Sequence, residues 1–222
     1  MVRKVGFSPI AWCLMAVCGS SAALSGVLIQ PPAMMSTEQI RIATVSYRVP
    51  ALRLVRQTGQ SISLPEELND GRPVVLNFIF TSCGAICPLM TQTIASFQRS
   101  LGPDSARVHI MSISVDPEED TPARLRDYAR EYHAGAGWTF YTGTPEASIG
   151  AQKAFNIYRG DKMSHTAVTF MRAAPGDSWE RLDGLATPEQ LLQQYRRLIN
   201  GRVAAGEPAA ALNRPAEAPT RR

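Results

Sequence analysis

Two short apolar runs, with a helical pattern between them, constrain the fold of this chain more than any other feature. Residues 74–80 and 108–115 are nearly continuous runs rich in branched and aromatic side chains, which is typical of strands buried on both faces. Between them, residues 88–100 carry apolar side chains at helical spacing, and Gly102-Pro103 follows as a helix stop. The pattern predicts two central strands joined through a helix.

The rest of the body continues this alternation of strands and helices. Three expected helices begin with Thr-Pro, which places a capping hydroxyl before a proline at the first helical position. Such alternation predicts an α/β fold in which a central mixed sheet is flanked by helices and preceded by a β-hairpin. The expected segments are the hairpin at 52–64, strands at 138–141, 166–171 and 179–182, and helices at 121–133, 144–155 and 187–199.

The N-terminal segment, residues 1–35, has the character of a membrane anchor. Arg3 and Lys4 precede an uncharged stretch that includes residues 10–29, about the length needed to cross a bilayer. A cleaved signal peptide is the alternative, with Ser21-Ala22-Ala23 offering small residues for cleavage. Both interpretations export the domain. As an anchor, the segment would hold the domain at the inner membrane, facing the periplasm; as a signal peptide, it would leave the domain soluble after cleavage. Disulfides can form in that compartment.

The remaining boundaries follow from composition. Residues 36–46 are expected to be a linker, residues 47–200 the folded domain, and residues 201–222 an Ala- and Pro-rich disordered tail. Between positions 36 and 200, 17 basic residues balance 17 acidic ones, so the net charge of +4 comes from the two ends of the chain. A balanced body lacks the electrostatic footprint of a protein that binds nucleic acid, and we expect no such partner.

Two of the four cysteines lie in the body, directly after the first buried strand. Cys83 is expected in a loop and Cys87 in the first turn of the following helix. The free amides and the dipole at a helix N-terminus stabilise a thiolate, so the pKa of one or both cysteines should fall. Two thiolates do not complete a zinc site, which takes four ligands, whereas copper(I) accepts two or three soft ligands. The pair can therefore form a disulfide or bind a soft metal ion.

The three histidines of the chain differ in their surroundings. His109 lies inside a buried strand and His133 ends a helix, and both positions favour structural roles. His165 follows a polar loop and directly precedes a strand, with no proline at that place. Its side chain has room to face the thiols, but the layout alone leaves ligand and structural roles equally open.

The cysteine segment Phe80 to Pro88, the acidic segment Ser114 to Pro122, and Asp161 to Thr166 together resemble the Sco/SenC family. These are membrane-anchored, thioredoxin-fold copper proteins that help assemble the CuA centre of cytochrome c oxidase. Residues 138–143 also look like the family, and the resemblance covers residues 47–199. The motif departs from many members in having Gly84 and Ala85 between the cysteines.

This resemblance implies that Cys83, Cys87 and His165 bind one copper ion per chain, as Cu(I), Cu(II) or both. The implied partners are the CuA-bearing subunit of the oxidase, an upstream copper donor or thiol reductant, and the membrane at the N-terminal segment. Asp161 is a candidate for tuning the imidazole as a neighbouring carboxylate. The acidic loop is a candidate for docking a partner protein. The simpler interpretation is that its charges stabilise the start of the following helix. The candidate residues of the loop are Asp116, Glu119 and Asp120.

Three functions are considered for this site. A redox or copper sensor, which would keep the ligands and transfer nothing, is a further alternative. One of the three is a copper metallochaperone. Another is a thiol–disulfide reductase that uses Cys83 and Cys87 as its redox pair and has no need of His165. The third, a thiol peroxidase, needs a threonine three residues before its cysteine, where this chain has Phe80. That mismatch argues against the peroxidase.

Overall fold

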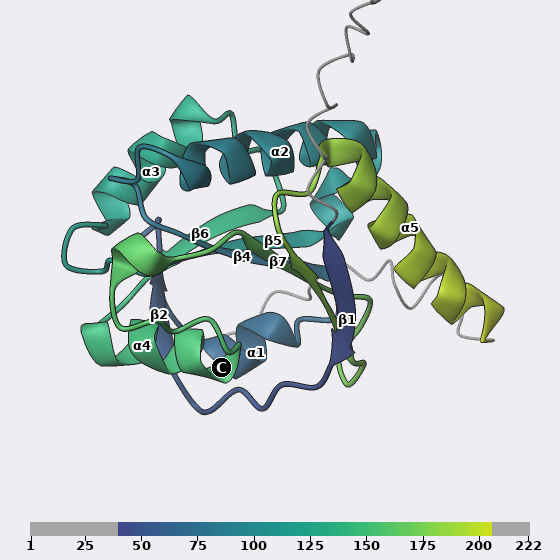
Figure 1. Cartoon of the computed structure of the whole chain (residues 1–222), viewed down its shortest axis with the longest axis horizontal. Helices are drawn as coiled ribbons and strands as arrows, with labels where there is room; N and C mark the ends of the chain where they lie inside the picture. Colours follow the sequence, from purple (N-terminus) through teal and green to yellow (C-terminus); the bar gives the residue numbers. More distant parts are fainter. Residues whose placement is uncertain (1–39, 206–222) are drawn as a thin grey trace, which may run out of the picture. The chain divides into compact units, whose positions relative to one another are not determined.

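The computed structural model describes residues 40–205, which contain eight strands, five α-helices and two short 3-10 helices (Figure 1). The strands are β1 (Arg41–Val45), β2 (Arg53–Arg56), β3 (Ser61–Ser63), β4 (Val74–Ile79), β5 (His109–Ser114), β6 (Trp138–Thr142), β7 (Val168–Arg172) and β8 (Trp179–Asp183). The helices are α1 (Leu64–Leu68), α2 (Ile86–Leu101), α3 (Pro122–Glu131), α4 (Pro145–Ala154) and α5 (Pro188–Ala204), with 3-10 helices η1 (Gly102–Arg107) and η2 (Lys162–Ser164).

All eight strands belong to one mixed sheet. Their spatial order is β1-β8-β7-β4-β5-β6-β2-β3. The parallel strands β4, β5 and β6 lie side by side, and β7 and β2 pair antiparallel with β4 and β6. The hairpin of β2 and β3 closes one edge of the sheet. This arrangement confirms the expected α/β class, the mixed sheet and the early hairpin.

The sheet separates two apolar cores. In β4 all six residues are buried, and alternate side chains enter opposite cores because strand side chains alternate between faces. One core contains Phe78 and residues of α1 and α4, and the other contains Ile79 and residues of α2, α3 and α5. In Figure 1, α2, α3 and α5 accordingly lie on one side of the sheet, with α1 and α4 on the other. Cys87 belongs to the core under α2.

The three Thr-Pro helix starts form as predicted. The hydroxyls of Thr121, Thr144 and Thr187 each accept a hydrogen bond from the amide three residues further on. The amide of Thr187 in turn donates to Oε1 of Gln190, which completes the capping box. These caps fix where the three helices begin.

Two predicted boundaries are wrong. Residues 41–45 are not a linker but form β1, which pairs antiparallel with β8 from Arg41↔Asp183 to Val45↔Trp179. Four of its five residues are exposed, so it lacks the apolar alternation that marks a strand in sequence. Helix α5 also continues to Ala204, past the expected end of the domain.

The predicted membrane segment and most of the predicted tail lie outside the described residues. Within residues 40–205, no helix combines the length and apolar character needed to cross a bilayer.

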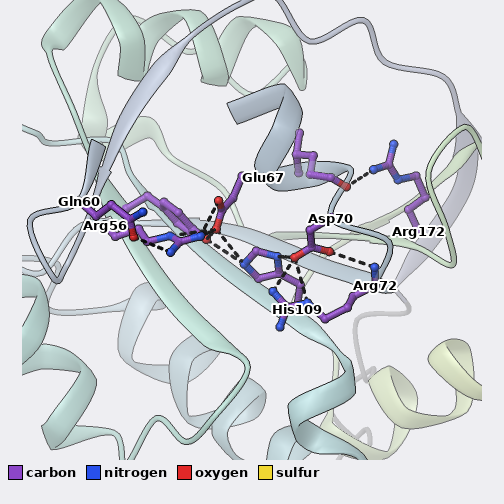
Figure 2. A network of polar contacts seen from close by, with 9 residues as sticks. Arg56, Gln60, Glu67, Asp70, Arg72, His109 and Arg172 are labelled. Carbon is purple, nitrogen blue, oxygen red and sulfur yellow. Dashed lines mark hydrogen bonds and ion pairs between the residues drawn. The ribbon is translucent and has the colours of Figure 1, made fainter. Parts of the chain in front are cut away.

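A buried polar network lies at the amino ends of β4 and β5 (Figure 2). His109 is 1% exposed, and its Nδ1 lies 2.7 Å from Oδ2 of Asp70. The Tyr141 hydroxyl donates to Oε1 of Glu67 at 2.7 Å and lies 2.8 Å from Nε2 of His109. Arg56 completes the network with bonds to both carboxylate oxygens of Glu67. The structural role expected of His109 fits these contacts.

Asp70 links this network to the pH dependence of stability. Burial alone would raise the pKa of Asp70, but hydrogen bonds from His109 and Arg72 outweigh it and hold the pKa well below its usual range. A carboxylate with a depressed pKa in the folded state stabilises the protein above its unfolded pKa. That contribution is lost as the pH falls toward the folded value.

We therefore predict that Asp70→Asn lowers the free energy of unfolding at pH 7 by about 2 kcal/mol, the scale of hydrogen bonds to a charged group. Between about pH 5 and pH 2 the stability of the wild type should fall more steeply than that of the variant. Urea denaturation over this pH range measures both effects. The matched control is Asp104→Asn, because Asp104 pairs with Arg107 on the exposed surface. Parallel pH profiles for wild type and Asp70→Asn would contradict the assignment.

Candidate metal centre

The two cysteines lie at the carboxyl end of β4, the central strand. The strand ends at Ile79, and α2 begins at Ile86. Cys83 lies in the connecting loop, where its amide donates to the carbonyl of Phe80 at 3.2 Å. Cys87 lies in the first turn of α2, and its amide donates to Sγ of Cys83 at 3.4 Å. Both cysteines are free thiols, and they occupy the positions that the sequence predicts.

The two thiols have opposite electrostatic environments. Partial burial would raise the pKa of Cys83, but backbone amides at the start of α2, that of Cys87 foremost, lower it. Cys87 is 0% exposed, and burial raises the pKa of its thiol to about 12, with further contributions from Cys83 and Asp120. The fall in pKa expected for one or both thiols therefore occurs at Cys83 and not at Cys87, because burial in the core outweighs the helix N-terminus.

His165 lies against the edge of β4. It follows η2 and precedes β7, and its Nε2 lies 3.0 Å from the carbonyl oxygen of Phe78. A carbonyl only accepts, so Nε2 carries the proton and the lone pair is on Nδ1. Burial lowers the pKa of His165, which favours the neutral ring that metal binding needs. A backbone carbonyl that fixes the tautomer in this way is a common support for a ligating histidine.

Cys87 and His165 both interact with the backbone at the carboxyl end of β4. The backbone of Phe80 lowers the pKa of the Cys87 thiol, and the Phe78 carbonyl accepts from His165. Within residues 40–205, however, no three Cys, His, Asp or Glu side chains are arranged to hold one ion. An ion shared by all three predicted ligands requires at least one of them to move.

The donor set fits a soft monovalent ion. It offers a thiolate favoured by its surroundings, a buried thiol that a metal can deprotonate, and a neutral imidazole. Thiolates and imidazole suit copper, and low coordination numbers suit copper(I). Structural zinc takes four ligands, whereas the two thiols and the imidazole supply three.

Asp120 holds the cysteine loop in place. It is 0% exposed, accepts from the Thr81 hydroxyl at 2.5 Å and from the Thr81 amide at 3.2 Å, and accepts from the hydroxyl of Ser114 at 2.6 Å. Its carboxylate therefore ties the start of the cysteine loop to the end of β5. The sequence alone does not indicate this role for Asp120, because its partner, Thr81, lies 39 residues away in the chain.

Burial contradicts a docking role for two of the three acidic candidates. Asp116 is 6% exposed and accepts from Lys162 at 2.6 Å, and Asp120 is fully enclosed. Both carboxylates bond within the domain and are not presented to a partner. Glu119 is exposed and pairs with Arg124.

Asp161 supports the turn before the histidine. Its Oδ1 accepts from the amide of Met163 at 2.9 Å, which caps η2. In the described structure the imidazole contact comes instead from the Phe78 carbonyl. The expected contact between this carboxylate and the ring is thus replaced by a backbone group.

Comparisons with known proteins agree on one family. The SCO1/SenC family model matches residues 44–200. A SCO1 protein homolog of Bacillus subtilis is 36% identical over 106 residues, which are 47% of this chain and 54% of that protein. The chain spans about half the length of this curated relative.

Solved structures show the same fold. The structure of Bradyrhizobium japonicum ScoI with copper bound has a TM-score of 0.58 and 25% identity, and the match covers 67% of this chain and 98% of that one. The structure of BsSco has a TM-score of 0.59 and 28% identity, and the match covers 70% of this chain and 95% of that one. BsSco is described as a member of the Sco family of cytochrome c oxidase assembly proteins with a disulfide switch.

The unequal thiols predict unequal alkylation. At pH 8, iodoacetamide should modify Cys83 about a hundredfold faster than Cys87, because thiolate is the reactive form and Cys87 is both buried and protonated. Peptide-resolved mass spectrometry gives the two rates. Cys87→Ser is the control and should leave the rate at Cys83 within a few-fold of the wild type. Similar rates at both cysteines would contradict the described environments.

Proposed function

The chain belongs to the SCO1/SenC family, and we propose that it is a copper metallochaperone. Cys83, Cys87 and His165 bind one copper ion and pass it to the CuA-bearing subunit of cytochrome c oxidase. The observation that carries the proposal is that the carboxyl end of β4 bears an accessible thiol with a lowered pKa, a buried thiol and a neutral imidazole. The copper-bound ScoI structure, 25% identical to this chain, supports copper as the cargo.

Each ligand has a distinct part in binding and release. Cys83 is half-buried and is the sulfur to which an incoming copper donor can transfer the ion. Cys87 binds from within the core and must lose its proton, so binding releases a proton to solvent. His165 binds through Nδ1 while the Phe78 carbonyl keeps its ring oriented. Release to a target cysteine proceeds by ligand exchange through Cys83.

Export to the non-cytoplasmic side completes this proposal. The uncharged stretch at residues 10–29 either tethers the domain to the inner membrane or directs its export before cleavage. In both cases the domain reaches the periplasmic side, where a copper donor and the oxidase subunit are accessible to it.

The proposal predicts how copper(I) affinity depends on each ligand. We expect the reduced wild type to bind one Cu(I) in competition with a chelator under anaerobic conditions. Cys83→Ser should abolish stoichiometric binding, because one thiol and one imidazole make a poor soft-metal site. His165→Ala should weaken binding by about tenfold or more.

The matched control is His133→Asn, which changes a histidine far from the site in sequence. His133 has a φ of 55°, and asparagine tolerates this left-handed conformation better than alanine. The control should bind copper like the wild type. Full binding by Cys83→Ser, or equal affinity for wild type and His165→Ala, would contradict the three-ligand site.

A thiol–disulfide reductase is the second candidate, supported by the asymmetry of the two thiols. The Cys83 thiolate would attack a target disulfide and form a mixed disulfide. Cys87 would then displace the second target thiol, leaving a Cys83–Cys87 disulfide and a target reduced by two electrons. This chemistry does not use His165.

Histidine therefore separates the two candidates. We predict that His165→Ala still forms a Cys83–Cys87 disulfide that dithiothreitol reduces, because the residue takes no part in sulfur exchange. Thiol counting before and after reduction measures this. A folded variant that cannot form the disulfide would show that the histidine positions the cysteine pair as well as the metal.

A further inference from the structure

The segment that carries His165 is weakly attached to the domain. Residues 158–164 are all exposed. Their backbone bonds are local: the amide of Ser164 donates to the carbonyl of Asp161, and that of His165 to Lys162. Arg159 also bonds locally, to the carbonyls of Asn156 and Tyr158. These contacts shape the segment but do not fix its position relative to the cysteines.

Residues 159–165, which we call the histidine segment, make polar contacts with the body of the described domain through two side chains. The imidazole of His165 meets the Phe78 carbonyl. Lys162 donates to Oδ2 of Asp116 at 2.6 Å, and its Nζ lies 6.0 Å from the ring centroid of Phe80. Phe80 is three residues before Cys83. Lys162 therefore connects the histidine segment with the ends of both β4 and β5.

The carboxylate that receives Lys162 is itself rigidly held. Asp116 is 6% exposed, and its amide donates to Oγ of Ser114 at 2.9 Å. The same hydroxyl donates to Asp120, which receives the Thr81 amide and hydroxyl at the start of the cysteine loop. A continuous chain of polar contacts thus runs from the cysteine loop to the histidine segment, and Lys162 is its last member.

A cavity of about 480 Å³ lies beside this ion pair. Both Asp116 and Lys162 line it, together with residues of α4 such as Ser148 and Gln152. Gly160 and Asp161 line the same cavity, so this part of the histidine segment faces open space rather than α4 side chains there. The α4 contact of this region is that of the Lys153 ammonium, which lies 5.2 Å from the ring centroid of Tyr158.

We propose that Lys162 is a positioning residue for His165. Its ion pair with Asp116 holds the segment against the ends of β4 and β5, which keeps the imidazole at the Phe78 carbonyl while copper binds. This inference rests on the proposed copper site. Without the pair, the segment must be ordered at the moment of binding, and that ordering entropy weakens the affinity.

The sign of the effect distinguishes positioning from simple electrostatics. Removing a positive charge near the site favours binding of a cation. Loss of the contact that positions His165 instead weakens copper binding. Arg159 supplies the matched control, because its charge acts on His165 and its hydrogen bonds are local to the segment. Arg159→Met removes the charge and keeps the tether.

The experiment compares Cu(I) affinity in the reduced full chain for wild type, Lys162→Met, Lys162→Arg and Arg159→Met. We expect Lys162→Met to bind about threefold to tenfold more weakly, Lys162→Arg to stay within about twofold because the cation is kept, and Arg159→Met to bind as tightly as the wild type or more so. In the His165→Ala background, Lys162→Met should have no effect, because a positioning residue acts only through the residue it positions.

A second measurement uses the metal-free protein. Amide hydrogen exchange of the peptide containing residues 159–165 should accelerate in Lys162→Met and stay unchanged in Arg159→Met. Unchanged exchange, or copper binding by Lys162→Met as tight as that of the wild type, would overturn the positioning role. Equal weakening with and without His165 would also overturn it.

These outcomes are separable from failure of the proposed function. If wild type and His165→Ala bind copper equally, the three-ligand site is wrong and the positioning role falls with it. If the histidine matters and Lys162 does not, only the positioning role is wrong.

Discussion

Burial of β4 on both faces is the constraint on which the rest of the structure depends. Its six residues are all buried, and it hydrogen-bonds to β5 on one side and β7 on the other. A strand so enclosed has a fixed position and register, because a shift by one residue would exchange the side chains of the two cores. The loop that follows it therefore leaves the sheet at a fixed point. This strand therefore sets the positions of Cys83, of Cys87 and of the carbonyl group that contacts His165.

The same burial makes the two thiols unequal. Cys87 occupies the core under α2, where the charged form of its thiol is poorly solvated, whereas Cys83 remains in the loop among backbone amides. A metal ion resolves this asymmetry because it replaces the proton of the buried thiol with its own charge. A disulfide resolves it as well. The proposed copper binding and the proposed thiol exchange therefore both depend on the burial of Cys87.

Two histidines illustrate how the fold assigns roles to the same side chain. His109 lies at the amino end of β5, surrounded by Asp70, Tyr141 and Glu67, and each ring nitrogen faces a polar partner. It is part of the interior. His165 lies toward the opposite end of the central strands and has one backbone partner, which leaves its Nδ1 lone pair for another group. Partners contributed by distant elements account for the difference.

The sequence alone predicts the order of the strands from β2 onward and of helices α2 to α5. It also predicts the three Thr-Pro helix starts and the place of Cys83 and Cys87 between a buried strand and a helix. These features are local, because hydrophobic period, capping residues and turn residues act over a few positions. Strand β1 was not predicted, because it is an exposed edge strand without the apolar alternation that marks a strand in sequence. Folding establishes the features that the sequence does not predict: the buried state of Cys87, the Phe78 carbonyl beside His165, the Asp120 bond to Thr81, and the link from Lys162 to Asp116. Each of these joins residues from separate elements, and burial and long-range hydrogen bonds exist only once the sheet has brought those elements together.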